Sequence, residues 1–507
     1  MKKKQLLFIL TLLFLLAANV FTAQARKIPH IILCWDKTKV QCVLYFYGID
    51  EGSGSLPQPS GLVVLKTYSD PEVTLKDWNE QPEWVKDLRS NAFNWVDERG
   101  LTREVQRTRS NDRSWVEYAM VFDSSFRDVR PTSTAYWFAI NNLDKPFDIK
   151  GFENLNTSEV TNMNGMFKGY WDLELDLSTM DTRKVKSMRL MFSDTFSNGY
   201  EGKLDLSHFD TSNVTDMSLM FDECDYPGYI DASHFNTSNV TNMSHMFGSC
   251  YKATGVNVSS FNTSNVTNMS YMFDNCHSLQ SLDVSNFDTG KVTNMRNMFN
   301  RCYKITSLDL HNFNTSNVTD MGEMISEMSA LTSVDLSSFD TRNVKGMAYM
   351  FYGDESLTTL DLSSFNTSKV TYMTQMFENS DRLTRIYVSD DWTTASVNTE
   401  YGGDDMFLNC KAITGEFGQT YDKNKVNYNM AFCGPGGYLW HKDSPHSTLT
   451  GDANGDGKVD AADIVEIVKY LNGHPSAKFN QTNADANGMG GVTAEDIKAV
   501  VGIILSK

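Results

Sequence analysis

A 26-residue unit repeats through the middle of the chain and restricts the folds that the chain can adopt. It is clearest over residues 259–285, which read SSFNTSNVTNMSYMFDNCHSLQSLDVS. The valine of its V-T-x-M core recurs in steps of 25, 29 and then uniformly 26 residues, at Val160, Val185, Val214, Val240, Val266, Val292, Val318, Val344 and Val370. A fixed period between about 20 and 50 residues is typical of stacked repeat architectures.

Each copy predicts a short helix and a strand. The apolar spacing in the first half is that of one helical face, at Val266, Met269, Met272 and Phe273. The second half alternates apolar and polar residues, as a strand does, at Leu282, Asp283, Val284 and Ser285. One copy has too few apolar side chains to fold alone, so the copies must stack, with parallel strands about 4.8 Å apart.

The repeat resembles two known patterns. Its L-x-x-L-x-L-x-x-F segment resembles a leucine-rich repeat, and with T-S-N-V-T-x-M-x-x-M-F it is similar to the BspA-type repeat of bacterial surface proteins, over roughly Tyr118 to Tyr438. The resemblance implies an α/β leucine-rich-repeat solenoid with one parallel strand and one short helix per turn. It also implies a secreted or surface protein, because some members of that family adhere to host matrix proteins or to other bacteria.

Five regions follow from these patterns. Residues 1–25 have the lysines, the apolar run and the Ala23-Gln24-Ala25 box of a secretory signal peptide. Residues 26–154 are predicted to form an N-terminal β-rich cap, 155–415 the repeats, 416–445 a C-terminal cap and linker, and 450–507 a small all-α domain. No other segment is long and apolar enough for a transmembrane helix. The sequence therefore predicts a secreted protein, extracellular or at the cell surface.

The N-terminal region is rich in aromatic residues. The interpretation that we favour is a cap over the first strand of the array. The alternative is a carbohydrate platform built from exposed aromatic rings such as Trp78, Trp84 and Trp95. Cys34 and Cys42 flank a hairpin that is expected to begin near Ile31, and either a disulfide or two thiols would suit that position.

Stacking would place equivalent residues in columns. One column collects cysteines, expected to be buried reduced thiols, at Cys224, Cys250, Cys276, Cys302 and Cys410. Another collects outward aspartates of the strand, at Asp205, Asp231, Asp283, Asp309, Asp335 and Asp361. These aspartates either bond to neighbouring serines and water on a soluble face, or form an acidic surface that selects basic partners.

The C-terminal segment carries two calcium-binding patterns. The first places oxygen donors at positions 1, 3, 5, 9 and 12 of a twelve-residue loop, at Asp452, Asn454, Asp456, Asp460 and Asp463, with the backbone carbonyl of Lys458 at position 7. The second has Asp485, Asn487, Thr493 and Asp496, but Met489 at position 5. We therefore expect the second loop to bind calcium more weakly, or through water. Helices are expected over 464–471 and 497–505.

A duplicated loop that keeps only its exiting helix, with Asp at position 12, resembles a type I dockerin. The resemblance implies calcium as the cofactor and a cohesin module as the partner. The usual recognition positions of that family, ten and eleven of each loop, fall on Ala461, Ala462, Ala494 and Glu495. The alternative is a calcium-stabilised tail without a partner.

The formal net charge of −18 argues against nucleic-acid binding. The sequence shows no metalloprotease, nucleophile-elbow or phosphate-loop motif, so we expect no enzyme activity. The function hypothesis is a secreted binding or adhesion protein that holds a host matrix protein, a bacterial surface protein or a glycan. One alternative is a non-catalytic accessory subunit of a polysaccharide-degrading complex. The other is a catalytic site within residues 26–118.

Overall fold

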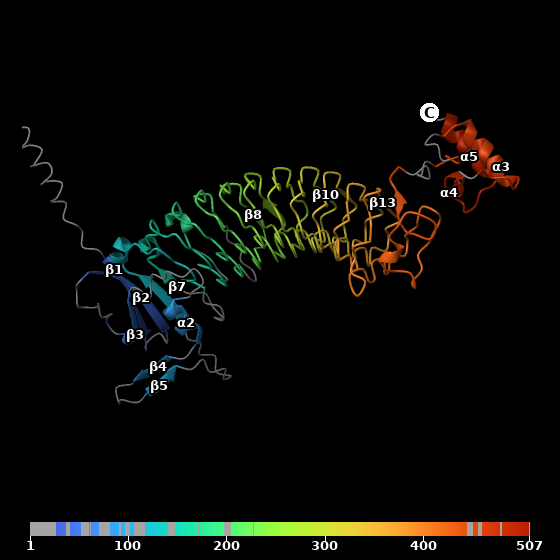
Figure 1. Ribbon diagram of the computed structural model, residues 1–507. Helices are drawn as coiled ribbons and strands as arrows, with labels where there is room; N and C mark the ends of the chain where they lie inside the picture. Colours follow the sequence, from blue (N-terminus) through green and yellow to red (C-terminus); the bar gives the residue numbers. More distant parts are fainter. Residues whose placement is uncertain are drawn as a thin grey trace, which may run out of the picture. The chain divides into compact units, whose positions relative to one another are not determined.

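The computed structural model describes most of the chain (Figure 1). The described residues are 27–36, 41–51, 60, 62–69, 82–90, 93–96, 102–105, 117–139, 148–170, 173, 175–196, 204–226, 228–443, 450–454, 459–476 and 479–505. The predicted signal peptide, residues 1–25, lies outside them. Two compact units divide the chain: the first runs to Val266 and includes Asn275–His277, and the second holds Thr267–Asp274 and everything from Ser278.

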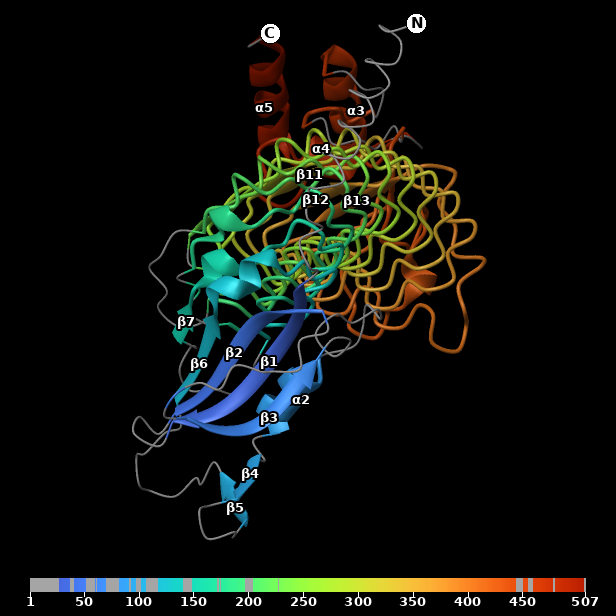
Figure 2. The ribbon, with the colours of Figure 1, turned by 90° about the vertical axis from the view of Figure 1, so that its left-hand side faces the viewer.

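A five-stranded sheet opens the first unit, with strand order β3-β1-β2-β6-β7 (Figure 2). Its strands are β1 (Lys27–Asp36), β2 (Gln41–Asp50), β3 (Val63–Ser69), β6 (Glu117–Phe122) and β7 (Asp148–Lys150). The β1–β2 and β1–β3 pairs are antiparallel, whereas β2–β6 and β6–β7 are parallel. The expected hairpin is therefore confirmed. Cys34 lies opposite Val43 and carries a free, buried thiol, so the disulfide interpretation fails.

Aromatic side chains fill the interior behind this sheet. The rings of Phe46 and Phe122 stack at 4.3 Å between centroids. Trp84, from α2 (Glu83–Ser90), packs edge-on against Phe46 at 5.5 Å and is fully buried. A buried Trp84 contradicts its place in an exposed carbohydrate platform; Trp78 and the Trp95 side chain lie outside the described residues. A separate antiparallel hairpin joins β4 (Phe93–Val96) and β5 (Thr102–Val105).

The repeats of the first unit lie parallel and in register. Strands β8 (Tyr229–Asp231) and β9 (Gly255–Asn257) pair so that Ile230 faces Val256. A second row of parallel bridges joins equivalent positions of successive copies, at Ser133, Asn162, Ser187, Asp216 and Asn242. Three short 3-10 helices, η1 (Ser124–Asp128), η2 (Phe152–Asn154) and η3 (Leu177–Thr179), complete the described elements of this unit.

The second unit repeats the same arrangement. Its strands are β10 (Ser307–Asp309), β11 (Ser333–Asp335), β12 (Thr359–Asp361) and β13 (Arg385–Val388). The β10–β11 pair sets Leu308 against Val334, and β12–β13 sets Leu360 against Ile386. Within each unit, like residues therefore lie beside like residues, and the predicted columns are confirmed there.

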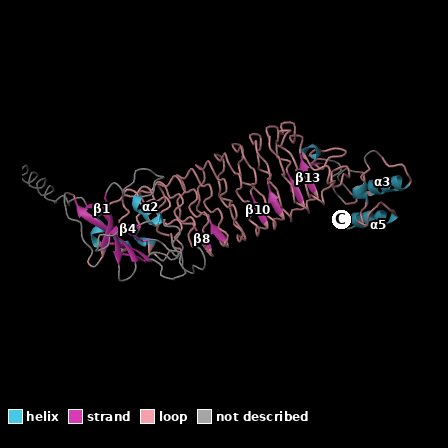
Figure 3. Ribbon diagram, turned by 90° about the horizontal axis from the view of Figure 1, so that it is seen from below, coloured by secondary structure: helices cyan, strands magenta, loops and turns pink. Residues whose placement is uncertain are grey.

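The predicted helix of each repeat is wrong. Among the described residues of 155–415 there is no α-helix, and Figure 3 shows this stretch as loop with short strands. The backbone N–H groups of Met269, Tyr271 and Phe273 donate to carbonyl oxygens of the next copy, at 2.8–3.1 Å. Tyr271 has φ 59°, which ends any helical turn. The apolar spacing fits this tight path as well as a helix, because neighbouring copies supply the hydrogen-bond partners that a helix would supply internally.

Buried ladders hold the copies together. Phenylalanine rings stack nearly parallel, for example Phe221 on Phe247 at 5.5 Å in the first unit and Phe351 on Phe377 at 5.9 Å in the second. Thr315 is buried, donates its hydroxyl to the Asp340 carbonyl oxygen at 3.0 Å and accepts the Asp340 N–H at 2.8 Å. One side chain therefore satisfies two backbone groups of the neighbouring copy.

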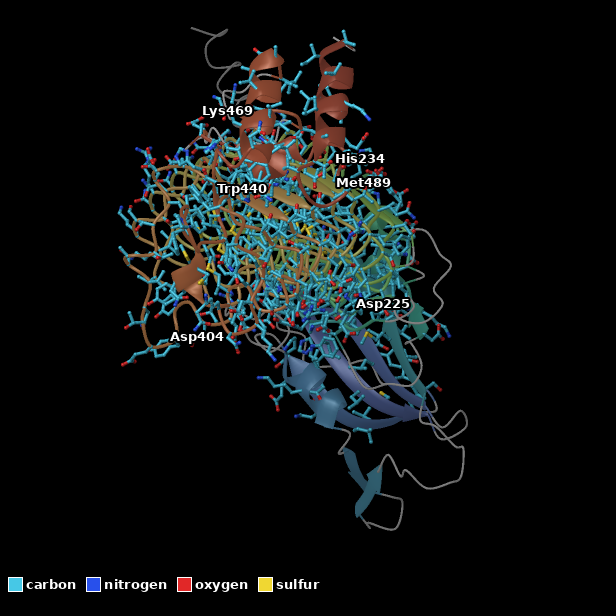
Figure 4. All side chains as sticks on the ribbon, turned by 90° about the vertical axis from the view of Figure 1, so that its right-hand side faces the viewer. Asp225, His234, Asp404, Trp440, Lys469 and Met489 are labelled. Atoms are coloured by element: carbon cyan, nitrogen blue, oxygen red, sulfur yellow. The ribbon has the colours of Figure 1, made fainter. Side chains whose placement is uncertain are left out.

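The last strand of the repeats is covered by the chain that follows it. After η4 (Tyr428–Met430), strand β14 (Trp440–His441) pairs in parallel with β13. The indole of Trp440, labelled in Figure 4, donates to the Thr414 carbonyl oxygen at 2.7 Å, and the Arg385 guanidinium lies 5.1 Å from its ring. The segment predicted as a C-terminal cap thus supplies a paired edge strand.

The C-terminal region is helical. Its helices are α3 (Ala461–Leu471), α4 (Gln481–Ala484) and α5 (Ala494–Leu505). Both long helices begin three residues before the predicted starts. Asp460 explains the earlier start of α3, because its side chain caps the helix and forms a capping box with Asp463. No described helix is both long and apolar enough to cross a membrane.

Candidate functional site: two calcium loops and the repeat surface

The first loop is organised around the carboxylate of Asp463. This side chain is fully buried, and its Oδ1 accepts the N–H of Asn454 at 3.0 Å while its Oδ2 accepts the N–H of Asp460 at 2.8 Å. Asp452, at the other end of the donor set, is also fully buried. The structure thus brings position 12 onto positions 3 and 9 of the loop. Asp456 and Lys458 lie outside the described residues.

The second loop repeats this geometry around Asp496. Its Oδ1 accepts the N–H of Asn487 at 3.0 Å, and its Oδ2 accepts the N–H of Thr493 at 2.8 Å and the Thr493 hydroxyl at 3.0 Å. Asp485 accepts the N–H groups of Met489, Gly490 and Gly491 at 2.9–3.1 Å. The described parts of the two loops therefore share one arrangement, in which the position-12 aspartate accepts the N–H groups of positions 3 and 9.

A common apolar core fixes the two loops. It contains Ala453, Val459, Ile467, Ala484, Val492 and Val500. Val459 and Val492 each precede position 9 of their loop, and Ile467 and Val500 each lie in the exiting helix. The Tyr470 and Phe479 rings stack at 4.5 Å beside this core. Each loop is thus anchored from both ends.

The donor chemistry of both loops suits calcium. Calcium prefers six to eight oxygen ligands from carboxylates, amides, carbonyls and water. A carboxylate has about four acceptor sites, so the N–H bonds to Asp485 and Asp496 leave acceptor capacity for an ion. Among the described residues, no three His, Cys, Asp or Glu side chains form a metal-binding group. The predicted sets rely also on Asn, Thr and a backbone carbonyl, and part of the first loop is not described.

The predicted recognition residues begin the two long helices. Ala461, Ala462, Ala494 and Glu495 are all exposed. Glu495 pairs with Lys498 at 2.7 Å, and the neighbouring ion pair in α3 joins Lys469, labelled in Figure 4, to Glu466.

Sequence reasoning missed an exposed apolar stripe on these helices. Val465, Val468 and Leu471 of α3 are 52%, 41% and 42% exposed, and Val501 and Leu505 of α5 are exposed as well. The spacing of three residues in α3 is the signal that could have revealed it, since Ile464 and Ile467 already supply the buried face. Such a stripe on a small domain is typical of a partner-binding surface.

The aspartate column of the repeats lies on exposed positions, four of which end strands β8, β10, β11 and β12. Asp205, Asp231, Asp283, Asp309, Asp335 and Asp361 each accept, through Oδ1, the backbone N–H two residues later, at 2.9–3.1 Å. Hydrogen bonding from Ser233 holds the pKa of Asp231 below its usual value. Lys442 also pairs with Asp361, at 3.1 Å. The aspartates therefore stabilise their own turns.

The cysteine column is buried and reduced. The described cysteines are free thiols, and the Sγ of Cys250 donates to the Phe221 carbonyl oxygen at 3.1 Å. Burial raises the pKa of this thiol well above its ordinary value. Ser380, in the same column, donates to the Phe351 carbonyl oxygen at 2.8 Å. The column therefore serves packing and hydrogen bonding.

Comparison with known families identifies both parts of the chain. Residues 134–226, 227–327 and 303–421 each match the family described as "Mycoplasma protein of unknown function, DUF285". Together these matches span more than half of the 507 residues. The chain belongs to the DUF285 family. Searches of curated proteins and of solved structures gave no match.

The DUF285 repeats are followed by a second recognised domain. Residues 450–505 match the type I dockerin domain, in agreement with the two loops and their helices. A type I dockerin domain binds calcium and supports attachment to a cohesin protein, and dockerin-containing proteins are typically extracellular or at the cell surface. The DUF285 chain therefore carries a calcium-dependent attachment domain after its repeats.

Proposed function

We propose that this chain is a secreted binding or adhesion protein whose repeats form the recognition surface and whose dockerin domain attaches it to a cohesin. The dockerin match carries the proposal. A calcium-dependent attachment domain holds the rest of its chain beside a partner, so the repeats are the part that would bind something else. In this proposal the repeats are of the BspA leucine-rich type and form a solenoid. The in-register pairs of each unit support that reading, since they produce continuous columns of like side chains.

The attachment would use the exposed ends and faces of α3 and α5. Ala461, Ala462, Ala494 and Glu495 stand at the helix starts, and the apolar stripe of Val465, Val468 and Leu471 continues from them. Calcium would be held by the loop residues Asp452, Asn454, Asp460 and Asp463, with Asp485, Asn487, Thr493 and Asp496 in the second loop. The positive charge of the ion would draw these oxygen ligands together. This would hold in place the first residues of α3 and α5, which follow the two loops.

A second candidate function is a non-catalytic accessory subunit of a polysaccharide-degrading complex. The dockerin domain supports this candidate as well, because it would place the repeats beside other subunits. In both cases the chain acts by binding. A catalytic role is not part of the proposal.

Affinity capture tests the proposal. The mature chain should retain cohesin-containing proteins from the secreted fraction of its source organism in calcium, and release them on chelation. Asp463→Ala should abolish this capture, because it removes the carboxylate that closes the first loop. Capture that persists with chelator, or that is equal for a chain lacking residues 450–507, would contradict it.

A further inference from the structure

A polar groove lies on one edge of the repeats in the second unit. Its volume is about 510 Å³, and its lining includes Tyr303, Glu327, Tyr352, Gly353, Asn379 and Asn409. These residues lie on the turns that lead from the M-x-x-M-F segment to the strand, so the groove is separate from the aspartate column. Its volume is in the range of ligand-binding clefts.

The register of the repeats arranges this lining as a row. Glu327, Gly353 and Asn379 are 26 residues apart and occupy the same position of successive copies. All three have positive φ, at 52°, 69° and 63°, so the turn has the same shape in each copy. Five successive copies contribute the lining from Tyr303 to Asn409. At a spacing of about 4.8 Å between neighbouring copies, they extend over about 19 Å.

Gly353 opens the middle of the row. A Cβ at this position would lie only 3.3 Å from Cγ of Glu327, so a larger side chain would have to displace Glu327 or extend into the groove that Gly353 lines. The left-handed backbone does not by itself require glycine here, because Glu327, Asn379 and Asn409 adopt it at the same position. Glycine therefore leaves a gap that the other copies fill.

The polar groups around the gap are already held in place. Glu327 accepts hydrogen bonds from Arg301 at 3.0 Å and from the Tyr303 hydroxyl at 3.3 Å. Asn409 donates to the Asn379 side-chain oxygen at 2.7 Å. Pre-oriented acceptors and amides of this kind fix the orientation of a bound polar molecule with little loss of side-chain entropy.

The lining indicates a neutral, polyhydroxylated ligand. The lining carries the carboxylates of Glu327, Glu355 and Asp381 and the cation of Lys411, and Arg301 pairs with Glu327 from outside the lining. The remaining small negative charge disfavours an anionic ligand. Tyr303 and Tyr352 supply ring surface, while carboxylates and amides supply hydrogen bonds. Because the copies repeat about every 4.8 Å, a linear oligosaccharide lying along them would meet a further set of polar groups at each copy.

We propose that this groove binds a neutral oligosaccharide along the stack of repeats, with its middle unit in the gap at Gly353. The inference rests on the proposed function in one respect, namely that the repeats are the recognition part of the chain. Cohesin capture depends on the dockerin domain, so the two can fail separately.

Titration calorimetry of the mature chain with cellohexaose, xylohexaose and mannohexaose tests the proposal. At least one hexasaccharide should bind, with affinity unchanged between about 0.05 and about 0.5 M NaCl. Gly353→Asn should weaken it about tenfold by filling the gap, and Tyr352→Ala should weaken it about tenfold by removing ring contact. Hexalysine serves as a cationic probe.

Tyr372→Ala is the matched control, since Tyr372 is 44% exposed and is not part of the groove lining. Its affinity should stay within about twofold of the unchanged chain, and all three variants should melt as the parent does. The proposal is overturned if no hexasaccharide binds, if Gly353→Asn and Tyr352→Ala both bind as the parent does, or if only hexalysine binds, in a salt-sensitive way. Cohesin capture by the same variants reports on the attachment function separately.

Discussion

Single residues break the repeat pattern in particular copies. In the buried column, Asp354 occupies the position that cysteine takes in other copies. It is fully buried, and its Oδ1 accepts the N–H of Met328 at 2.9 Å. Its Oδ2 has no hydrogen-bond partner among the described residues. Burial raises the pKa of this carboxyl well above its ordinary value of 3.8.

The raised pKa of Asp354 predicts a pH-dependent stability. Between 3.8 and the folded-state pKa, the folded chain keeps a proton that the unfolded chain releases. Stability should therefore fall as pH rises through this window, and the loss should be complete above the folded-state pKa. Asp354→Asn should remove this dependence and stabilise the second unit at pH 8 by about 1–3 kcal/mol. Thermal melts across pH 4–8 measure it, with the exposed Asp381→Asn as control; equal pH profiles would refute the prediction.

Met489 is expected to make the second calcium loop weaker than the first. Its side chain is 87% exposed at position 5, where an oxygen ligand is expected. Met489→Asp should raise the calcium affinity of this loop about tenfold, because a carboxylate adds both a ligand and a charge. Calcium titration followed by circular dichroism measures this, and Met489→Leu should leave the affinity unchanged. An Asp variant that titrates like the parent would show that position 5 does not reach the ion.

At the scale of elements, the strands and calcium loops were predictable and the repeat helices were not. Alternation of apolar and polar residues predicts the positions of β8 to β13, although the copy with Leu282 and Val284 forms no strand. The spacing of the loop donors fixes the geometry of the calcium loops directly. The Val266–Phe273 pattern specifies only which side chains face inward. The backbone path of this segment is set by hydrogen bonds to the next copy, for example from the Met269 N–H to the Asn294 carbonyl oxygen. The sequence of one copy does not contain these partners. The groove escaped prediction for a similar reason, because its lining comes from several copies that only stacking brings together.

Buried threonines such as Thr315 are expected to stabilise the repeats by bonding to backbone groups of the neighbouring copy. Thr315→Val removes the hydroxyl that serves both the N–H and the carbonyl of Asp340, leaving two polar groups unpaired. The free energy of unfolding should fall by about 2–4 kcal/mol. Urea unfolding and amide exchange at Asp340 measure this. Thr319→Val is the control: its exposed hydroxyl donates only to Thr293, and the variant should lose less than about 1 kcal/mol.

For the whole molecule, the in-register stacking predicts tolerance to the loss of a complete copy. Deleting residues 214–239 removes one period and joins Asn213 to Val240, which restores the N-V sequence of the repeat. The shortened chain should fold cooperatively, because each remaining copy keeps an equivalent neighbour. Deleting residues 214–226 removes half a period and should abolish cooperative unfolding. Circular dichroism melts compare the two; similar behaviour of both deletions would contradict the stacking argument.

The short strand β14 has a consequence for how the protein behaves at high concentration. A ladder of parallel strands ends in a row of unsatisfied amides and carbonyls that can template another chain. By pairing Trp440 and His441 with Tyr387 and Val388, β14 occupies that row and exposes only two residues of its own. We therefore expect this end of the repeats to resist strand pairing with a second copy of the protein, even at high concentration.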